Sequence, residues 1–324
     1  PRPDLRAAAD VGGGPVRHAL TVPVLLALAS AARAQTLEDE VRRVIPDLFA
    51  GLLGVTLSEE ISGASFRVDN GATADDTHFS TFRIPWSADH ALEGLRGALH
   101  LEATAGVLLA RDFLSLDTPS GLATVRQEWT IASAQVGAGW GFPLGSSWSL
   151  RPGATLALAY LENDARYNAA GQVELAPQLD GVLVNWDGWA VSPAANLTLE
   201  RERDPTRLAY GVEGRYTLAH TYVFEATSAA QEGSDSSRIL AARAELGAPF
   251  ELAPDGAVRS AWDVFAGGVQ FGDVEREALG FDRFLEFGVG LTKTFRRLPP
   301  LRLGLAWIAG EDIRGYALGL SLGS

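Results

Sequence analysis

The feature that most limits the fold of this chain is a set of long segments in which apolar and polar residues alternate. In "LAYGVEGRYTLAHTYVF", Leu208 to Phe224, every second residue belongs to a mostly apolar series, while Glu213 and Arg215 fall between them. A period of two is typical of a β-strand, whose successive side chains point to opposite faces. The segment is far longer than an ordinary strand of about 5–6 residues. It is long enough to cross a bilayer, where a tilted strand needs about 9–11 residues in the hydrocarbon.

Similar alternation recurs along most of the chain and predicts an all-β fold. Examples are "LRGALHLEATAGVLLA" at 95–110 and "FLEFGVGLTKTF" at 284–295. The breaks between such segments predict twelve strands, at 61–69, 77–86, 95–111, 123–143, 148–162, 182–200, 207–226, 237–251, 257–272, 282–296, 301–308 and 314–323.

The predicted connections and the aromatic residues indicate a membrane barrel. Connections at 144–147, 201–206, 252–256 and 297–300 are short, whereas those at 112–122, 163–181, 227–236 and 273–281 are longer and polar. Aromatic residues gather near both ends of the predicted strands, as they do at the two membrane interfaces of outer-membrane barrels. The alternative, a soluble sandwich or propeller, would need shorter strands and a second layer to cover each apolar face. We therefore expect a twelve-stranded antiparallel transmembrane β-barrel.

The beginning of the chain predicts export from the cytoplasm. Arg17 and His18 precede the apolar run "ALTVPVLLALASAA", and "ARA" at 32–34 provides a cleavage site of small residues. These are the parts of a secretory signal peptide, and the apolar run is too short for a membrane span. Residues 1–34 are thus interpreted as upstream residues and a cleaved signal.

Residues 35–57 have a different period from the rest. Leu37, Val41, Val44, Ile45, Leu48 and Leu52 follow the spacing of an amphipathic helix. Thr36 can cap its start, and Pro46 should kink it. The barrel would then occupy residues 58–324.

A single helix before twelve C-terminal strands resembles the translocator barrel of autotransporters, whose helix lies inside the barrel. Because almost nothing separates the predicted cleavage site from the helix, the chain is similar to the solitary members of that family, which carry no passenger. The resemblance implies an N-terminal helix in the lumen as a plug, and a structural or narrow pore-type role rather than an enzymatic one. One departure is the ending "LSLGS", where such barrels usually finish on an aromatic residue.

The inner face of the predicted barrel carries charged residues of both signs. The candidate residues are His100, Glu102, Arg151, Glu200, Arg207, Glu213, Arg215, Glu225, Arg243, Glu245, Glu286 and Arg302. They could form a solute-selective channel, or an ion-pair network that fills a narrow barrel and holds Arg42 and Arg43 of the helix. We favour the network and keep the channel as the alternative.

A lipid hydrolase is a third hypothesis. His78 and Ser80 stand two residues apart on the outward face of a predicted strand, as in outer-membrane phospholipases, with Asn70 or Asp76 to orient the histidine. A single His-x-Ser is weak evidence, so no catalytic residue is assigned.

The composition limits partners and cofactors. The chain has no cysteine and a formal charge of −13, so it can form neither a disulfide nor a thiolate site, and nucleic acid is not an expected partner. No spacing of His, Asp and Glu suggests a metal, and no cofactor motif is present. Expected partners are outer-membrane lipid and lipopolysaccharide, the barrel assembly machinery and periplasmic chaperones, with the cell outer membrane as the location.

Overall fold

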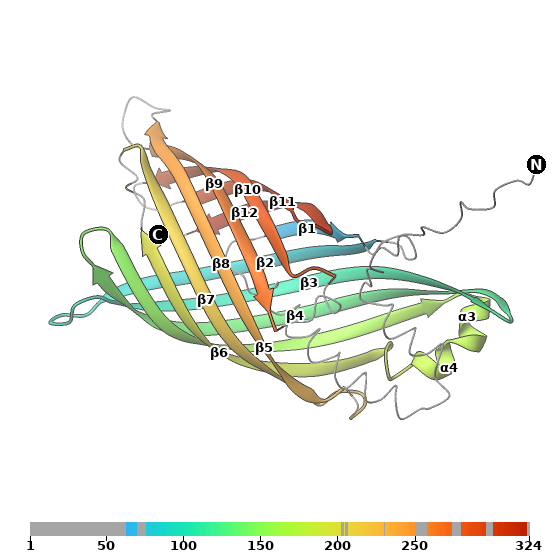
Figure 1. Ribbon diagram of the computed structural model, residues 1–324. Coiled ribbons are helices and arrows are strands. Elements are labelled where there is room, and N and C mark those ends of the chain that lie inside the picture. The colour runs from blue at the N-terminus through green and yellow to red at the C-terminus, as the bar shows by residue number, and fades with distance from the viewer. Residues whose placement is uncertain are drawn as a thin grey trace, which may run out of the picture.

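The computed structural model shows a closed antiparallel barrel (Figure 1). The structure describes residues 63–69, 76–201, 204, 207–229, 231–250, 258–273, 280–295 and 301–322. Neighbouring strands pair in sequence order, and β1 pairs with β12 to close the ring, with Gly63 opposite Leu318. Closure leaves no unpaired strand edge, which hydrocarbon would not tolerate.

Twelve strands lie within the described residues, as the alternation predicts. Their bounds are β1 Gly63–Val68, β2 Thr77–Ala91, β3 Ala98–Thr118, β4 Gly121–Leu144, β5 Trp148–Tyr167, β6 Trp186–Arg201, β7 Ala209–Phe224, β8 Gly233–Phe250, β9 Val258–Gly272, β10 Arg283–Phe295, β11 Leu301–Ala309 and β12 Ile313–Leu322. We call the end of the barrel at which β1 begins and β12 ends the terminal end, and the opposite end the distal end.

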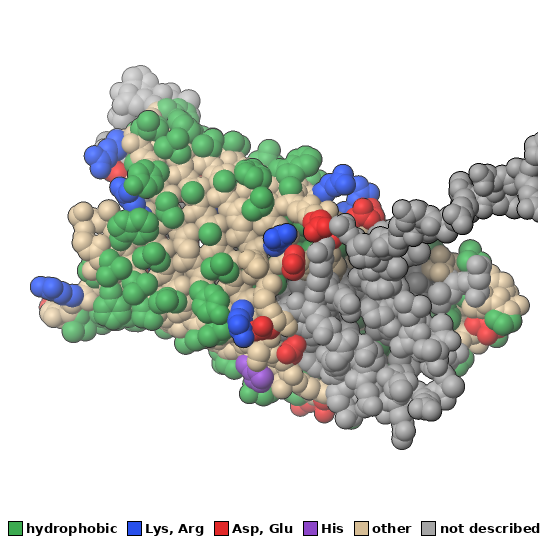
Figure 2. All heavy atoms as spheres, in the orientation of Figure 1, with side chains coloured by type: hydrophobic (Ala, Val, Ile, Leu, Met, Phe, Trp, Pro, Cys, Tyr) green, Lys and Arg blue, Asp and Glu red, His purple; other side chains and the backbone are tan. Residues whose placement is uncertain are grey.

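The outer face of the barrel is apolar. On β2, Phe82, Ile84 and Trp86 are each more than half exposed, whereas the alternating Thr81 and Arg83 are buried. In Figure 2, green apolar side chains spread over the visible wall, and most charged side chains gather toward its two ends. An apolar band between polar rims is the outer surface expected of a barrel in a membrane.

Several predicted loops are partly wrong, among them 227–236, because β8 already begins at Gly233. The segment 112–122 was predicted as a loop, but β3 continues to Thr118 and β4 begins at Gly121, with Pro119 and Ser120 between them. The polar residues of this segment are accommodated in the extended hairpin, in which β3 and β4 stay paired as far as Thr118 opposite Gly121. Figure 1 shows β3, β4 and β5 reaching beyond the other strands at the distal end.

The connection from β5 to β6, predicted as a loop over 163–181, contains two short helices at the distal end. These are α3, Ala169–Glu174, and α4, Ala176–Leu179. The side chain of Asn168 caps α3 by accepting a hydrogen bond from the backbone N–H of Gly171. Leu175 and Leu179 pack with Ala123 and Val184 in a small apolar cluster that holds the connection against β4. In the part of the chain that is described, neither helix nor any other is long and apolar enough to cross a membrane.

Candidate functional site: a lumen with two regions

The inner face of the barrel is not uniformly polar, contrary to the expectation from sequence. Toward the distal end the inward side chains form one buried apolar cluster, which we call the distal cluster. It comprises Ala64, Phe66, Val68, Phe79, Leu108, Ala110, Ile131, Ala157, Ala159, Leu161, Trp186, Ala190, Val223, Phe265, Val269, Phe271, Phe281, Phe284, Ala306, Ile308, Ile313 and Ala317. Its residues come from β1 to β7, from β9 to β12 and from the connection before β10, so the cluster reaches around the wall.

Aromatic rings connect opposite parts of the distal cluster. Phe281, in the connection between β9 and β10, is 3% exposed. Its ring meets the ring of Phe66 on β1 at 6.2 Å and that of Phe271 on β9 at 6.0 Å, edge to face. Phe66 in turn stacks on Phe79 of β2 at 5.0 Å. Edge-to-face and offset rings at such distances attract each other beyond their burial, so these rings tie β1 and β2 to β9.

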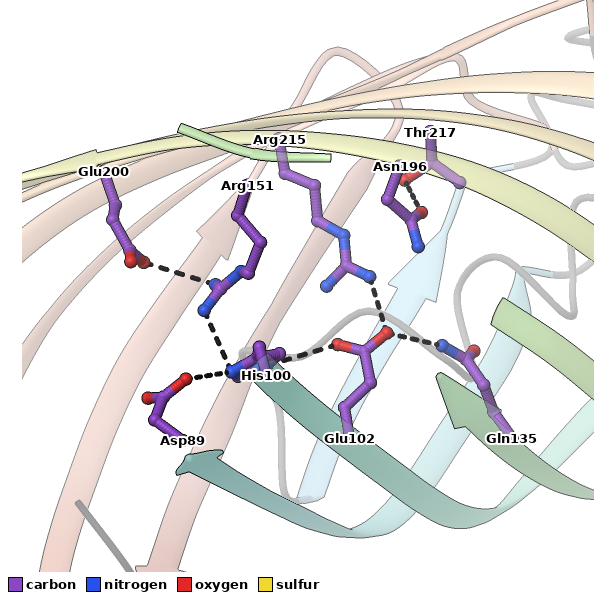
Figure 3. A network of polar contacts seen from close by, with 9 residues as sticks. All are labelled: Asp89, His100, Glu102, Gln135, Arg151, Asn196, Glu200, Arg215 and Thr217. Carbon is purple, nitrogen blue, oxygen red and sulfur yellow. Dashed lines mark hydrogen bonds and ion pairs between the residues drawn. The ribbon is translucent and has the colours of Figure 1, made fainter. Parts of the chain in front are cut away.

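A polar network replaces the apolar packing toward the terminal end (Figure 3). Nδ1 of His100 on β3 lies 2.9 Å from Oδ1 of Asp89 and 3.0 Å from Nη1 of Arg151 on β5. With a proton on Nδ1 the ring donates to Asp89, and without it the ring accepts from Arg151, so it serves one partner at a time. Arg151 also donates to Oε2 of Glu200 at 3.2 Å, and Ser149 donates to the other oxygen of that carboxylate at 2.7 Å.

Glu102 carries the same network across the barrel. Nη2 of Arg215 on β7 donates to Oε1 of Glu102 on β3 at 3.0 Å, although three strands separate β3 from β7 in the ring. Gln135 of β4 reaches the same oxygen at 3.5 Å. The side chains of Glu102 and Arg215 are only 12% and 16% exposed. A charge-assisted hydrogen bond at such a site is stronger than one between neutral groups.

A second polar group lines the wall from β8 to β11. Arg302 on β11 donates to Asp263 on β9 at 2.5 Å, and its guanidinium lies 3.7 Å from Glu245 on β8. The guanidinium of Arg243 lies over the ring of Phe265 at 3.8 Å, a cation–π contact. Glu286 on β10 is 3% exposed, and its carboxylate is attracted electrostatically by Arg243, Arg83 and Arg302.

Two glycines of β10 make room for this group. A Cβ atom at Gly290 would lie 2.5 Å from the carboxylate of Asp263, and one at Gly288 would overlap the ring of Phe265. Both glycines alternate with the outward Phe287, Val289 and Leu291, so they occupy inward positions. The absence of side chains at Gly290 and Gly288 therefore leaves space for the Arg302–Asp263 salt bridge and for the ring of Phe265.

The polar region is built as paired charges. Each ion pair named above joins a cation on one strand to a carboxylate on another. Among the described residues no cluster of three or more His, Cys, Asp or Glu side chains could hold a metal ion. The geometry supports mutual neutralisation of charges inside the wall.

The comparison with protein families decides what kind of barrel this is. A family model described as the solitary outer membrane autotransporter beta-barrel domain matches residues 67–321. The chain belongs to this family. It is an outer-membrane β-barrel of the type found in Gram-negative bacteria.

A solved autotransporter barrel shares the fold of this family member. The chain is similar to the translocator domain of the autotransporter NalP from Neisseria meningitidis, with 11% identity, a TM-score of 0.52 and coverage of 95% of this chain and 98% of that one. The transport unit of AIDA-I from Escherichia coli matches with 12% identity, a TM-score of 0.42 and coverage of 87% and 99%. The beta domain of Bordetella BrkA matches with 14% identity, a TM-score of 0.43 and coverage of 81% and 96%. No curated protein matches the sequence of the chain.

Two residues of the predicted inner set lie elsewhere in this autotransporter-type barrel. Arg207 precedes β7, is 75% exposed and pairs with Asp204 at 3.0 Å, so it belongs to a turn. Glu225 follows β7 in an exposed bend with a φ of 50°. The alternation was extended past both ends of the strand, where backbone direction changes and parity no longer fixes the face. Arg42 and Arg43 lie outside the described residues.

The remaining predicted residues fall into the two polar groups. The first group, around Glu102, contains His100, Glu102, Arg151, Glu200 and Arg215, and the second contains Arg243, Glu245, Glu286 and Arg302. Glu213 is half-buried, and it lies opposite Glu200 on β6 and opposite Arg243 on β8.

Sequence reasoning missed four charged or amide residues of the two polar groups described above. Arg83 and Asp263 stand at inward positions between large apolar residues, in "FRI" and "WDV", and the alternation itself could have found them. Gln135 also follows the parity of its strand. Asp89 was missed because the strand was expected to end at residue 86, whereas β2 continues to Ala91.

The proposed hydrolase pair is not supported by a catalytic arrangement. His78 and Ser80 are both exposed on the outward face of β2, as predicted from their parity. Asp76, which was expected to orient the histidine, pairs instead with Arg67 at 3.1 Å. Asn70, the other candidate, lies outside the described residues.

Proposed function

We propose that this barrel is a closed, non-enzymatic outer-membrane protein, whose lumen does not carry an open aqueous path at rest. The observation that carries the proposal is the distal cluster. Water-filled barrels have a polar interior, because an apolar lining would not stay wet. Here Leu108, Ile131 and Leu161 are inward, fully buried residues at that level.

The polar region supports the same proposal. Glu102 and Arg215 join β3 to β7 by a direct hydrogen bond, which places two side chains across the space that a solute would need. A selective channel would instead present unpaired charges or dipoles to the passing solute. The solute-selective channel remains the alternative, and its signature would be conductance in the intact protein.

The predicted helix at residues 35–57, with Arg42 and Arg43, lies outside the described residues and remains part of the proposal as a segment inside the lumen. The assembly partners also remain proposals, namely the barrel assembly machinery, periplasmic chaperones and contact with lipopolysaccharide. As a non-enzyme, the protein should show no lipase activity that Ser80→Ala could remove.

The test is single-channel recording of the refolded protein in a planar bilayer. We expect no resolved conductance steps for the wild type and frequent openings for Phe281→Ala, because Phe281 is the ring that joins Phe66 to Phe271. Phe82→Ala is the matched control, since Phe82 is an outward ring with 59% exposure on the lipid-facing wall. Steady openings of the wild type, equal to those of Phe281→Ala, would favour the channel instead.

A further inference from the structure

A groove on the outer wall interrupts the apolar band near the distal end. It has a volume of about 480 Å³ and crosses β6, β7 and β8, with Pro193, Ala195, Leu218, His220, Ser236 and Arg238 among its lining residues. It lies outside the lumen, so it does not depend on whether the lumen conducts.

The groove exists because outward residues of β6 are small where their neighbours are large. Along this strand Pro193 and Ala195 stand between the exposed Trp189 and Leu197. Pro193 also has no N–H to donate, and the pairing of β6 with β7 is interrupted between Val191 opposite Tyr222 and Ala194 opposite Ala219. The wall is therefore indented at this level, with an apolar floor beside Leu218.

One end of the groove holds an oriented histidine. Nδ1 of His220 lies 2.7 Å from Oγ of Ser236 on the neighbouring strand. The ring also meets the ring of Tyr222 edge to face at 4.4 Å. When the hydroxyl of Ser236 donates to Nδ1, the proton of the neutral ring is on Nε2. The contacts with Ser236 and Tyr222 orient the ring, and in that tautomer Nε2 is a hydrogen-bond donor.

Arg238 on β8 adds a cation to the groove, where it lies opposite Leu218 in register and two residues along β8 from Ser236. Its Nε lies 2.5 Å from Oδ2 of Asp273, and its side chain is 58% exposed. This contact uses one edge of the guanidinium. Within the described part of the chain, the two terminal nitrogens of Arg238 form no ion pair. Arginine can bind a carboxylate at one edge and a phosphate at the other, because its five N–H groups point outward in a planar fork.

We propose that this groove binds a phosphate-bearing lipid of the outer leaflet. The outward face of a closed membrane barrel meets lipid, so a lipid is the molecule available to an indentation in it. An acyl chain fits the apolar floor at Pro193, Ala195 and Leu218, and a phosphate accepts hydrogen bonds from Arg238 and His220. The distal end holds the longest connection and so faces the cell exterior, and Tyr222 with Trp189 marks the interface where headgroups lie.

The test is native mass spectrometry of the full chain, refolded in detergent and titrated with phosphatidylglycerol or phosphatidylcholine. We expect the anionic lipid to bind several-fold more tightly than the zwitterionic one. Arg238→Gln should weaken phosphatidylglycerol binding about fivefold, the effect of one arginine near a membrane surface. The matched control is Arg283→Gln, at an exposed distal-end arginine of β10 outside the groove, which should change binding less than twofold.

Two further measurements distinguish the binding of a whole lipid from the binding of a free anion and from nonspecific effects. Ala195→Trp should fill the floor and weaken binding while leaving Arg238 in place, whereas millimolar inorganic phosphate should not displace the lipid. Full displacement by phosphate would mean an anion site without acyl recognition and would overturn the proposal. An equal loss in Arg238→Gln and Arg283→Gln would also overturn it. A heat-dependent gel shift confirms that each variant is folded.

Discussion

The distal and terminal regions of the lumen are built on the same strands with opposite chemistry. On β3, Leu108 and Ala110 belong to the distal cluster, whereas His100 and Glu102, on the same inward face, belong to the polar network. The outer face of the same strand is apolar at both levels, with Leu101 beside the polar network and Leu109 beside the distal cluster. The inner face can therefore change character along a strand whose outer face does not. The distal region holds the barrel together by burial, and the terminal region by paired charges.

The largest effect should follow from placing a polar group in the distal region. Leu108→Asn removes a fully buried side chain and buries an amide without a partner, at a cost of about 3–6 kcal/mol when the two losses are added. Thr104→Asn, four residues nearer the terminal end on the same face of β3, should cost less than about 1 kcal/mol because polar neighbours can accept it. Urea unfolding in detergent compares the two. Equal losses would mean that the two regions do not differ in polarity.

Removing the ring of Phe281 should have the next largest effect. Phe281→Ala leaves a cavity between Phe66 and Phe271, which is expected to cost about 3–5 kcal/mol. The free energy of unfolding in urea measures this. Phe82→Ala on the lipid-facing wall should cost clearly less, and a reversed order would contradict the role of Phe281 in the distal cluster.

Breaking the cross-lumen pair should have an intermediate effect. Arg215→Ala removes its hydrogen bond to the carboxylate of Glu102, a loss of about 1.5–3 kcal/mol for a hydrogen bond to a charged group. The double variant Arg215→Ala with Glu102→Gln should recover part of that loss, because the carboxylate charge that Arg215 neutralised is gone. A double-mutant cycle measures the coupling. Additive losses would show that the two side chains do not interact.

The smallest effect is expected at the connection between β5 and β6, which lies outside the distal and terminal regions of the lumen. Tyr167, the last residue of β5, donates to Asp180 at 2.7 Å. Burial, and then this hydrogen bond, raise the pKa of the Tyr167 phenol above its ordinary value of 10.0. The folded state therefore holds this proton more tightly than the unfolded state, so the stabilisation is complete below pH 10 and declines as the pH rises above it.

Tyr167→Phe should cost about 1 kcal/mol at neutral pH and remove that decline. Unfolding curves at pH 8 and pH 11 test it, with Tyr216→Phe as the control because Tyr216 is an outward residue of another strand. A pH dependence that persists in Tyr167→Phe would assign it to another group.

The strands were predictable from sequence because alternation directly reports the two faces of a sheet. The same parity placed Arg215 and Glu102 on the inner face. Their contact across the lumen was not predictable, because it depends on barrel closure and on strands far apart in sequence. The distal cluster was also missed, since inward Phe66 and Phe79 were not separated from outward aromatic residues. Phe281 lies in a connection, where no periodicity indicates that a ring folds inward.

The groove on β6 to β8 shows a further limit of sequence reasoning. His220 lies on the outer face of β7, on the same side as Leu218 and Tyr222. Its partner Ser236 comes from the neighbouring strand, so only the register between strands brings the two together. Register is a property of the folded sheet that no single segment encodes.

The most direct test of the account is the accessibility of single cysteines inside the lumen. The chain has no cysteine, so Leu108→Cys and Thr217→Cys each introduce a unique thiol, one in the distal cluster and one on the polar inner face of β7. A membrane-impermeant thiol reagent is applied to the protein in liposomes, first from one side and then from both. We predict rapid labelling of the cysteine at position 217 and no labelling of that at 108 until the protein is unfolded. Equal labelling at the two positions would show that water fills the distal region, and would contradict a closed lumen.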